Sequence, residues 1–291
     1  MKQCKWLVCF LAALMPLMGC EQTAKTELKE PVPNQIIQEE DPTTPEPPAS
    51  EIPETPELPE TPTTSTTPEP PATQTPEPKE QTDTLVCSNT DGLCIRAGRG
   101  TSYARIGTMD AGDSVMPLGA SGGWYTVAYR GSVGYVSAKY LTEKSFAIGS
   151  EKIEEVIKQG KLWLGTPYVY GAQRYHYGNG ALNSAFTTDE FDCSSLMQYI
   201  FKKGANVNLA MTSREQSQQG TAVSRKNVRR GDLMFFTNAS RKNKSGVERI
   251  GHVALYLGNN YILHTASDYA VIEPISATRE SYFICARRIV A

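Results

Sequence analysis

The C-terminal half of the chain contains the stretch Phe191-Asp192-Cys193-Ser194-Ser195-Leu196. We expect a helix to begin near Cys193, because apolar residues recur at helical spacing from Leu196 and Gly204 ends the pattern. A helix N-terminus carries partial positive charge and unpaired N–H groups, which favour a thiolate. Cys193 is therefore a candidate nucleophile. On this stretch alone, a small buried residue is an equally good interpretation.

Two of the three histidines of the chain flank a predicted hairpin. The turn signal Gly258-Asn259-Asn260 separates the strands that carry His252 and His264. If all three residues form the loop, Leu257 pairs with Tyr261 and both histidines lie on one face of the hairpin. A two-residue loop would place them on opposite faces. On one face, His252 could serve a thiol as base while His264 holds its ring.

The order of the predicted elements favours an α+β fold for residues 148–291. We expect three helices, followed after Gly231 only by strands. The helices are expected over 151–164 with Ser150 as N-cap, from Cys193 to about 204, and over 213–216 as a capping box begun by Ser213. The strands are expected at 232–236, 252–257, 261–265, 271–275 and 282–290.

Residues 84–144 have a different pattern, in which short apolar runs alternate with Gly, Asn, Asp and Ser. This pattern predicts a small all-β barrel with tight turns. The segments 94–100, 122–127 and 134–141 closely resemble the bacterial SH3 domain. That resemblance implies a module that binds wall peptides or packs beside a catalytic domain.

The N-terminus is typical of an export signal. Lys2 and Lys5 precede the apolar segment 6–18, which is short for a bilayer span. The segment ends in Leu17-Met18-Gly19-Cys20, which resembles a bacterial lipobox. We therefore expect residues 1–19 to be removed and Cys20 to be lipidated, so that the protein is extracytoplasmic and anchored to the bacterial membrane. An ordinary secretory signal is the alternative.

Residues 20–83 are rich in Pro, Thr and Glu and are predicted to be a disordered linker. The net charge of −2 hides an asymmetry. Residues 21–83 hold 15 Asp/Glu against 3 Lys, whereas residues 84–291 hold 24 Lys/Arg against 16 Asp/Glu. A basic folded part suits an anionic polymer such as a cell wall, although a solvated surface without a target explains the charge equally well.

Several motifs together resemble the NlpC/p60 cell-wall cysteine peptidases, in matching order and spacing over essentially all of residues 150–291. They are Gly165-Thr166-Pro167-Tyr168-Val169-Tyr170-Gly171, the Cys193 stretch, Thr212-Ser213-Arg214-Glu215-Gln216, Gly231–Phe236, Gly251–Tyr256 and His264. The resemblance implies a papain-like catalytic domain at 148–291. It assigns Cys193 as nucleophile, His252 as general base and His264 as the residue that orients the His252 ring.

The same resemblance implies a peptidoglycan endopeptidase that cleaves stem peptides at the link from γ-D-glutamate to a diamino acid. Diaminopimelate and lysine stems, and intact wall and released muropeptides, all remain open as substrates. The alternatives are a non-catalytic wall-binding adaptor, which would not need all three residues, and an amidase or acyltransferase on the same fold.

Substrate-binding roles follow from the resemblance for Tyr168, Asp192, Ser194 and Ser213. Asp192 would pair with the free amine of a stem peptide, or only cap the helix, or do both. Ser213 is explained equally well by its capping pattern. The oxyanion would be met by the Cys193 N–H and a neighbouring donor such as Tyr168.

The chain departs from the family pattern in three places. Tyr170 replaces a usual Trp, Ala210-Met211 replaces a usual Pro-Arg, and about a dozen residues near 173–188 are inserted before Cys193. We expect this insertion to border the cleft and affect substrate preference, with His176 as an exposed loop residue.

The remaining expectations concern the other cysteines, cofactors and partners. Cys87 and Cys94 flank a turn signal, so that a disulfide and free thiols are equally good interpretations. Cys285 is expected to be buried. No Cys-x-x-Cys or His-Glu-x-x-His pattern occurs, so we expect no metal and no cofactor. We also expect a monomer with no nucleic-acid partner.

Overall fold

The computed structural model describes residues 81–265 and 268–291. The predicted signal peptide, the lipidation site Cys20 and nearly all of the predicted linker lie outside the described residues. Within the described part, no helix is long and apolar enough to cross a membrane.

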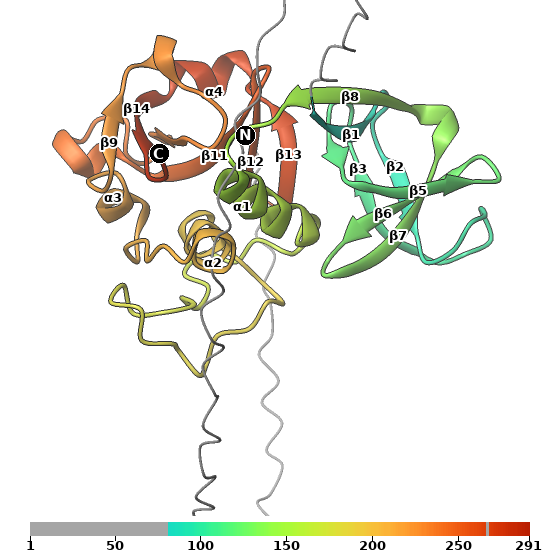
Figure 1. Cartoon of the computed structure of the whole chain (residues 1–291), viewed down its shortest axis with the longest axis horizontal. Coiled ribbons are helices and arrows are strands. Elements are labelled where there is room, and N and C mark those ends of the chain that lie inside the picture. Colours follow the sequence, from blue (N-terminus) through green and yellow to red (C-terminus); the bar gives the residue numbers. More distant parts are fainter. Residues whose placement is uncertain (1–80, 266–267) are drawn as a thin grey trace, which may run out of the picture. The chain divides into compact units, whose positions relative to one another are not determined.

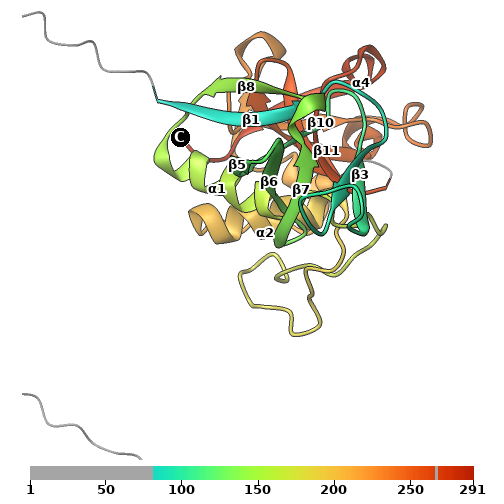
Figure 2. The same ribbon diagram turned by 90° about the vertical axis from the view of Figure 1, so that its right-hand side faces the viewer.

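The N-terminal described residues form eight strands and one 3-10 turn (Figures 1 and 2). Five strands make one antiparallel sheet in the order β3-β2-β7-β6-β5. The other three, in the order β8-β1-β4, belong to a second sheet. The elements are β1 (Thr82–Ser88), β2 (Leu93–Arg96), β3 (Arg105–Met109), β4 (Ser114–Val115), β5 (Pro117–Ser121), β6 (Trp124–Tyr129), β7 (Ser132–Ser137), η1 (Ala138–Tyr140) and β8 (Leu141–Ala147).

The C-terminal described residues place helices first and strands afterwards, as predicted. Their strands continue the second sheet, which has nine strands in the order β8-β1-β4-β13-β12-β11-β10-β14-β9. The helices are α1 (Glu151–Leu162), α2 (Cys193–Ala205), α3 (Ser213–Gln216) and α4 (Ala277–Ser281), with 3-10 turns η2 (Arg225–Asn227) and η3 (Gly246–Arg249). The strands are β9 (Thr221–Val223), β10 (Leu233–Phe236), β11 (His252–Gly258), β12 (Tyr261–Thr265), β13 (Ala270–Pro274) and β14 (Phe283–Arg288).

The main core lies between the helices and one face of this sheet. Helices α1 and α2 lie side by side (Figure 1), and α2 also packs on β11 and β12. Ile157, Ile200 and Leu263 are fully buried there. At α2 the buried face begins with Cys193 itself, so the packing of this helix fixes where the thiol lies.

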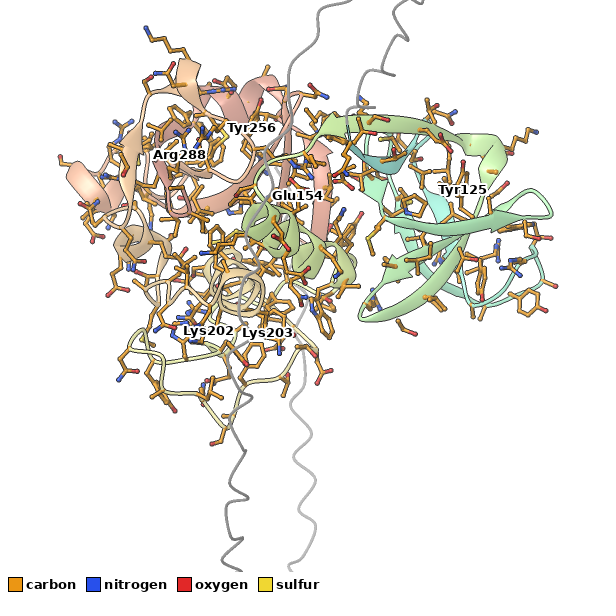
Figure 3. The ribbon with its side chains drawn as sticks, in the orientation of Figure 1. Tyr125, Glu154, Lys202, Lys203, Tyr256 and Arg288 are labelled. Atoms are coloured by element: carbon orange, nitrogen blue, oxygen red, sulfur yellow. The ribbon has the colours of Figure 1, made fainter. Side chains whose placement is uncertain are left out.

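Ion pairs connect several strands and helix α1. Arg288, which Figure 3 labels, lies at the end of β14 and pairs with Asp232, just before β10, at 2.8 Å. Asp83 on β1 accepts from two buried cations, Lys161 of α1 and Arg230, each at 2.7 Å. Arg230 also pairs at 2.7 Å with Glu154, which Figure 3 labels on α1. These contacts connect the first strand to the helical layer.

The hairpin that carries the two histidines differs in detail from its prediction. The turn consists of only Asn259 and Asn260, both with positive φ, and Gly258 pairs with Tyr261. A bulge at Leu257 then shifts the register by one residue, so that Leu255 faces Leu263. The three-residue loop was therefore wrong. The same-face placement of the histidines is retained, because the bulge adds the residue that the shorter turn omits.

Other local predictions need correction. Thr212, not Ser213, is the N-cap of α3, and its side chain and that of Glu215 form the capping box. α4 was not predicted. Its N-cap Ser276 lies inside a segment where we expected only strands and loops.

The cysteine expectations resolve differently for each residue. Cys87 and Cys94 are both free and lie in different sheets, which excludes the disulfide in this structure. The Cys87 sulfur lies 2.9 Å from the Ser114 hydroxyl. Cys285 is free and half-buried in β14.

His176 is fully buried, so the prediction of an exposed loop residue was wrong. Its backbone N–H donates to Gln198 of α2, and its Nδ1 accepts from the Gly178 N–H. Tyr175 beside it packs on Tyr199 of α2. The insertion is therefore packed against the helix that begins at Cys193.

Candidate active site

Cys193 is the first residue of α2, and the two residues beside it fix the start of the helix. Asp192 is the N-cap, and its carboxylate accepts from the N–H groups of Ser194 and Ser195. The Ser195 hydroxyl in turn accepts from the Asp192 N–H at 2.9 Å, which completes a capping box. These two reciprocal bonds hold the first turn of α2 and so fix the position from which the Cys193 side chain projects.

Burial is the largest influence on the Cys193 thiol. It raises the pKa of Cys193 to about 12, and the neighbouring Asp192 carboxylate acts in the same direction. The N–H groups of Val253 and Ser194 and the charge of Arg174 act the other way but are outweighed. The expected thiolate at the helix N-terminus is therefore not the resting form here. The thiol is neutral near neutral pH.

A chain of hydrogen bonds runs through the two histidines to a carboxylate. His252 Nε2 lies 2.9 Å from His264 Nδ1, and His264 Nε2 lies 2.9 Å from Glu273 Oε1. His252 begins β11, His264 lies on β12 and Glu273 on β13, so three adjacent strands supply one residue each. Arg279 of α4 approaches the same Glu273 oxygen at 3.5 Å.

This chain fixes which nitrogen of each ring carries a proton. A carboxylate can only accept, and the pKa of Glu273 is lowered, because bonds and charges from His264 and Arg279 outweigh the raising effect of burial. His264 must then donate through Nε2 and accept through Nδ1. His252 must donate through Nε2, which leaves its Nδ1 without a proton. Nδ1 of His252 is thus the nitrogen that can receive a proton from a thiol.

Both imidazoles are neutral near neutral pH. Burial lowers the pKa of His252 well below its ordinary value, and the positive charges that His264 and Arg279 can carry add to this effect. Burial also lowers the pKa of His264, although the bond to Glu273 opposes it. A neutral imidazole at His252 is able to accept a proton.

Two adjoining cavities border these residues. One, of about 320 Å³, is lined by Cys193 and its neighbours, and the other, of about 420 Å³, is lined by His252. Tyr168, Asn238 and Gly251 line both cavities. The thiol and the imidazole therefore open onto a shared cleft, with Tyr168 at the junction.

The four residues predicted to bind substrate all line the Cys193 cavity: Tyr168, Asp192, Ser194 and Ser213. The Ser194 hydroxyl donates to Asp192 at 3.0 Å. Ser213 is buried at the start of α3, which is held against α2 because the Gln216 side chain donates to the Ser194 carbonyl. Tyr170, where the family usually has Trp, also lines this cavity and is 86% exposed.

Three polar groups of these two cavities have no hydrogen-bond partner among the described residues. The Cys193 N–H has no acceptor among residues 81–265 and 268–291, which leaves it free to donate into the cleft. In the His252 cavity, the buried hydroxyls of Thr237 and Thr265 have no hydrogen-bond partner within the same described residues. Buried hydroxyls without partners are costly unless a ligand or water meets them.

Two residues of the site were missed from the sequence. Glu273 could have been noticed as an acid within the apolar strand 270–274, on the same face as His264 two positions along. Arg174 lies in the insertion that was expected to border the cleft, and it does line the Cys193 cavity, but its ion pair with Asp192 at 2.9 Å was not predicted. No local pattern predicts that contact. Within the described part of the chain, no group of three or more His, Cys, Asp or Glu is arranged to hold a metal ion.

Comparisons with known proteins find two matching families and several similar proteins. Residues 165–288 match the NlpC/P60 family, and residues 91–142 match the bacterial SH3 domain. The peptidoglycan endopeptidase RipA of Mycolicibacterium smegmatis is 35% identical over 116 residues, which is 40% of this chain and 21% of the relative. The gamma-DL-glutamyl hydrolase of Bacillus subtilis is 31% identical over 155 residues, which is 52% of this chain and 33% of the relative. A crystal structure of an NlpC/P60 family protein from Bacillus cereus aligns at 20% identity with a TM-score of 0.40, over 72% of this chain and 64% of the other.

These matches describe a protein with two modules, in which a small β-rich SH3-like module precedes a larger α+β domain. The match to the NlpC/P60 family over residues 165–288 follows the match to the bacterial SH3 domain over residues 91–142. Both resemblances predicted from the sequence are thereby confirmed. The chain spans a third or less of the length of the two curated relatives described above.

Proposed function

We propose that this protein is a peptidoglycan endopeptidase that hydrolyses the γ-D-glutamyl–diamino acid bond of stem peptides. The observation that carries the proposal is the bonded chain Glu273–His264–His252, which ends at the cleft lined by Cys193. The RipA relative is named a peptidoglycan endopeptidase, which supports the peptidoglycan substrate. The Bacillus subtilis relative is named a gamma-DL-glutamyl hydrolase, which supports the γ-glutamyl bond.

In the proposed mechanism, Nδ1 of His252 takes the thiol proton as the Cys193 sulfur attacks the scissile carbonyl carbon. The Cys193 N–H donates to the developing oxyanion, with Tyr168 at the cavity junction as a second candidate donor. His252 then gives its proton to the departing amine, and a thioester remains on Cys193. A water molecule, deprotonated by His252, attacks the thioester, and the sulfur leaves with a proton returned from the imidazole.

His264 and Glu273 act through His252 and not on the substrate. Their bonds hold the His252 ring with Nδ1 free and stabilise the imidazolium that forms during attack. Starting from a neutral pair suits this order of events, because burial disfavours charge on both Cys193 and His252 before substrate binds.

The setting that we propose is the outside of a bacterial cell membrane. The signal segment 1–19 and the lipobox-like Cys20 support a lipid anchor, and residues 20–83 would act as a linker to the wall. Replacing Cys20 with Ala should move the protein from the membrane fraction to a soluble fraction. Unchanged membrane association of the Cys20→Ala protein would remove the anchor from the proposal.

The substrate bond is tested with purified full-length protein and defined muropeptides, with the fragments identified by mass spectrometry. Cleavage between D-glutamate and the diamino acid is expected. Release of the whole stem from the sugar would instead indicate an amidase. Binding of wall fragments with no cleavage of any bond would support the wall-binding adaptor.

A further inference from the structure

The carboxylate beside the thiol is already occupied by a cation of the chain itself. Arg174 Nη2 lies 2.9 Å from Asp192 Oδ2, and the two side chains are only 15% and 7% exposed. The rest of the guanidinium is also engaged, because Nε donates to the Met211 carbonyl and Nη1 to the Ala172 carbonyl. The pair is therefore built into the wall of the cavity.

The other oxygen of Asp192 is used by the helix. Oδ1 accepts from the Ser194 N–H at 3.0 Å, the Ser195 N–H at 2.8 Å and the Ser194 hydroxyl at 3.0 Å. A carboxylate offers about four acceptor positions in all. With one bond on Oδ2 and three on Oδ1, Asp192 has little capacity left for an ammonium group from a ligand.

The remaining charges of the cavity are positive. Arg214 and Arg241 also line it, and Asp192 is the one carboxylate among its lining residues. The two outer arginines share Glu248, at 3.5 and 3.0 Å, and the side chain of that acid is 55% exposed. After Arg174 neutralises Asp192, the cavity wall keeps a surplus of positive charge that repels a cationic group.

We propose that Arg174 takes the place of a substrate ammonium, so that the site selects stem peptides whose N-terminal amine is acylated and not those with a free amine. This inference rests on the endopeptidase function proposed above and names its substrate class. Acylated amines occur where the stem is still joined to the glycan, so intact wall and its larger fragments are the matching substrates. A free ammonium would have to displace Arg174, which would then be left in a half-buried position without its partner.

The test compares two synthetic stem peptides that differ only in N-terminal acetylation. Full-length wild-type protein should cleave the acetylated peptide with a kcat/KM at least about tenfold higher than the free one. Arg174→Leu exposes Asp192 and should shift that ratio about tenfold or more toward the free amine. Arg174→Lys keeps the positive charge and should retain the wild-type preference. The matched control is Arg105→Leu, because Arg105 is exposed on β3 and lines neither cavity.

The outcomes separate the two proposals. A wild-type preference for the free peptide, or a ratio unaffected by Arg174→Leu, overturns the role of Arg174 and leaves the endopeptidase function standing. Cleavage of neither peptide overturns both. If Arg174→Leu fails to fold, the affinities of the two peptides for the Cys193→Ala and the Cys193→Ala/Arg174→Lys proteins decide. Tighter binding of the acetylated peptide by both proteins is expected, and equal or tighter binding of the free peptide contradicts the inference.

Discussion

Glu273 accepts a hydrogen bond from His264, with 2.9 Å between Oε1 and Nε2. Through this single bond an acid on β13 determines the tautomer of His264 and, one bond further along, that of His252. Three adjacent strands thus carry one bonded chain, which runs from Glu273 through His264 to His252.

Replacing Glu273 with Gln should lower kcat on the order of 100-fold while changing KM little. An amide can donate as well as accept, so His264 and His252 would no longer be held in the tautomer that leaves Nδ1 of His252 free. Steady-state kinetics on a stem peptide measures the effect. The matched control is Glu280→Gln, an acid at the end of α4 that pairs with Arg225 and lines neither cavity. A Glu273→Gln enzyme with wild-type kcat would show that the bond has no part in catalysis.

The neutral resting thiol predicts how Cys193 reacts with iodoacetamide. With its pKa raised to about 12, only a small fraction is thiolate near neutral pH, and that fraction grows about tenfold for each pH unit. Peptide-resolved mass spectrometry should show the alkylation rate of Cys193 rising steeply between pH 7 and pH 9. A rate that is high and nearly constant over this range would instead demonstrate a preformed thiolate–imidazolium pair.

Activity should fall on the acid side of neutrality and not on the alkaline side. His252 must be neutral to act as base, and its pKa lies well below the usual value of 6.5. Protonation therefore removes the base only when the pH falls below that lowered pKa, so kcat/KM should stay constant from pH 6.5 upward to about pH 9. A marked loss of kcat/KM between pH 7.5 and pH 6.5 would contradict the lowered pKa of His252.

The ion pairs of Asp83 should contribute strongly to stability. Burial tends to raise the pKa of Asp83, but bonds from Lys161 and Arg230 outweigh it, and the pKa is lowered overall. In Asp83→Asn, Lys161 would lose its carboxylate while 7% exposed, and Arg230 would keep only Glu154. The free energy of unfolding, measured with urea at pH 7, should fall by about 3 kcal/mol.

The control for this measurement is Asp189→Asn, because Asp189 is exposed in the insertion. It should change the free energy of unfolding by less than about 0.5 kcal/mol. Equal effects of the two substitutions would mean that the buried pairs of Asp83 add nothing beyond those of an exposed acid. The lowered pKa of Asp83 also predicts that acid destabilises the protein. A carboxyl whose pKa is lowered by folding contributes stability above its unfolded-state pKa and loses that stability as the pH falls through its folded-state pKa.

Sequence patterns predicted the elements better than the contacts between them. The start of helix α2 at Cys193 was predicted correctly, because its cap and its apolar spacing are local features of the sequence. The bulge at Leu257 was not readable, because it depends on how β11 pairs with β12. The shared face of the histidines was expected only for a three-residue loop, and it is retained because the bulge supplies the residue that the shorter turn omits.

Tertiary contacts account for the other differences. His176 has no local pattern that would distinguish a buried ring from an exposed one, and its burial comes from packing on α2. The Arg174–Asp192 pair joins an inserted loop to a helix cap, and Glu273 reaches His264 across a strand pair. Such pairings are set by topology, whereas sequence reasoning had only caps, periodicity and turn residues to use.

Hydrolysis by the Cys193→Ala protein tests the central claim most directly. The variant and the wild type are incubated at equal concentration with an acetylated stem peptide, and products are followed by mass spectrometry, with thermal unfolding as the check on folding. The proposed mechanism predicts cleavage at the γ-D-glutamyl bond by the wild type and no detectable product from a Cys193→Ala protein that unfolds at a similar temperature. Continued cleavage by the folded variant would contradict the assignment of Cys193 as the nucleophile and, with it, the thiol mechanism.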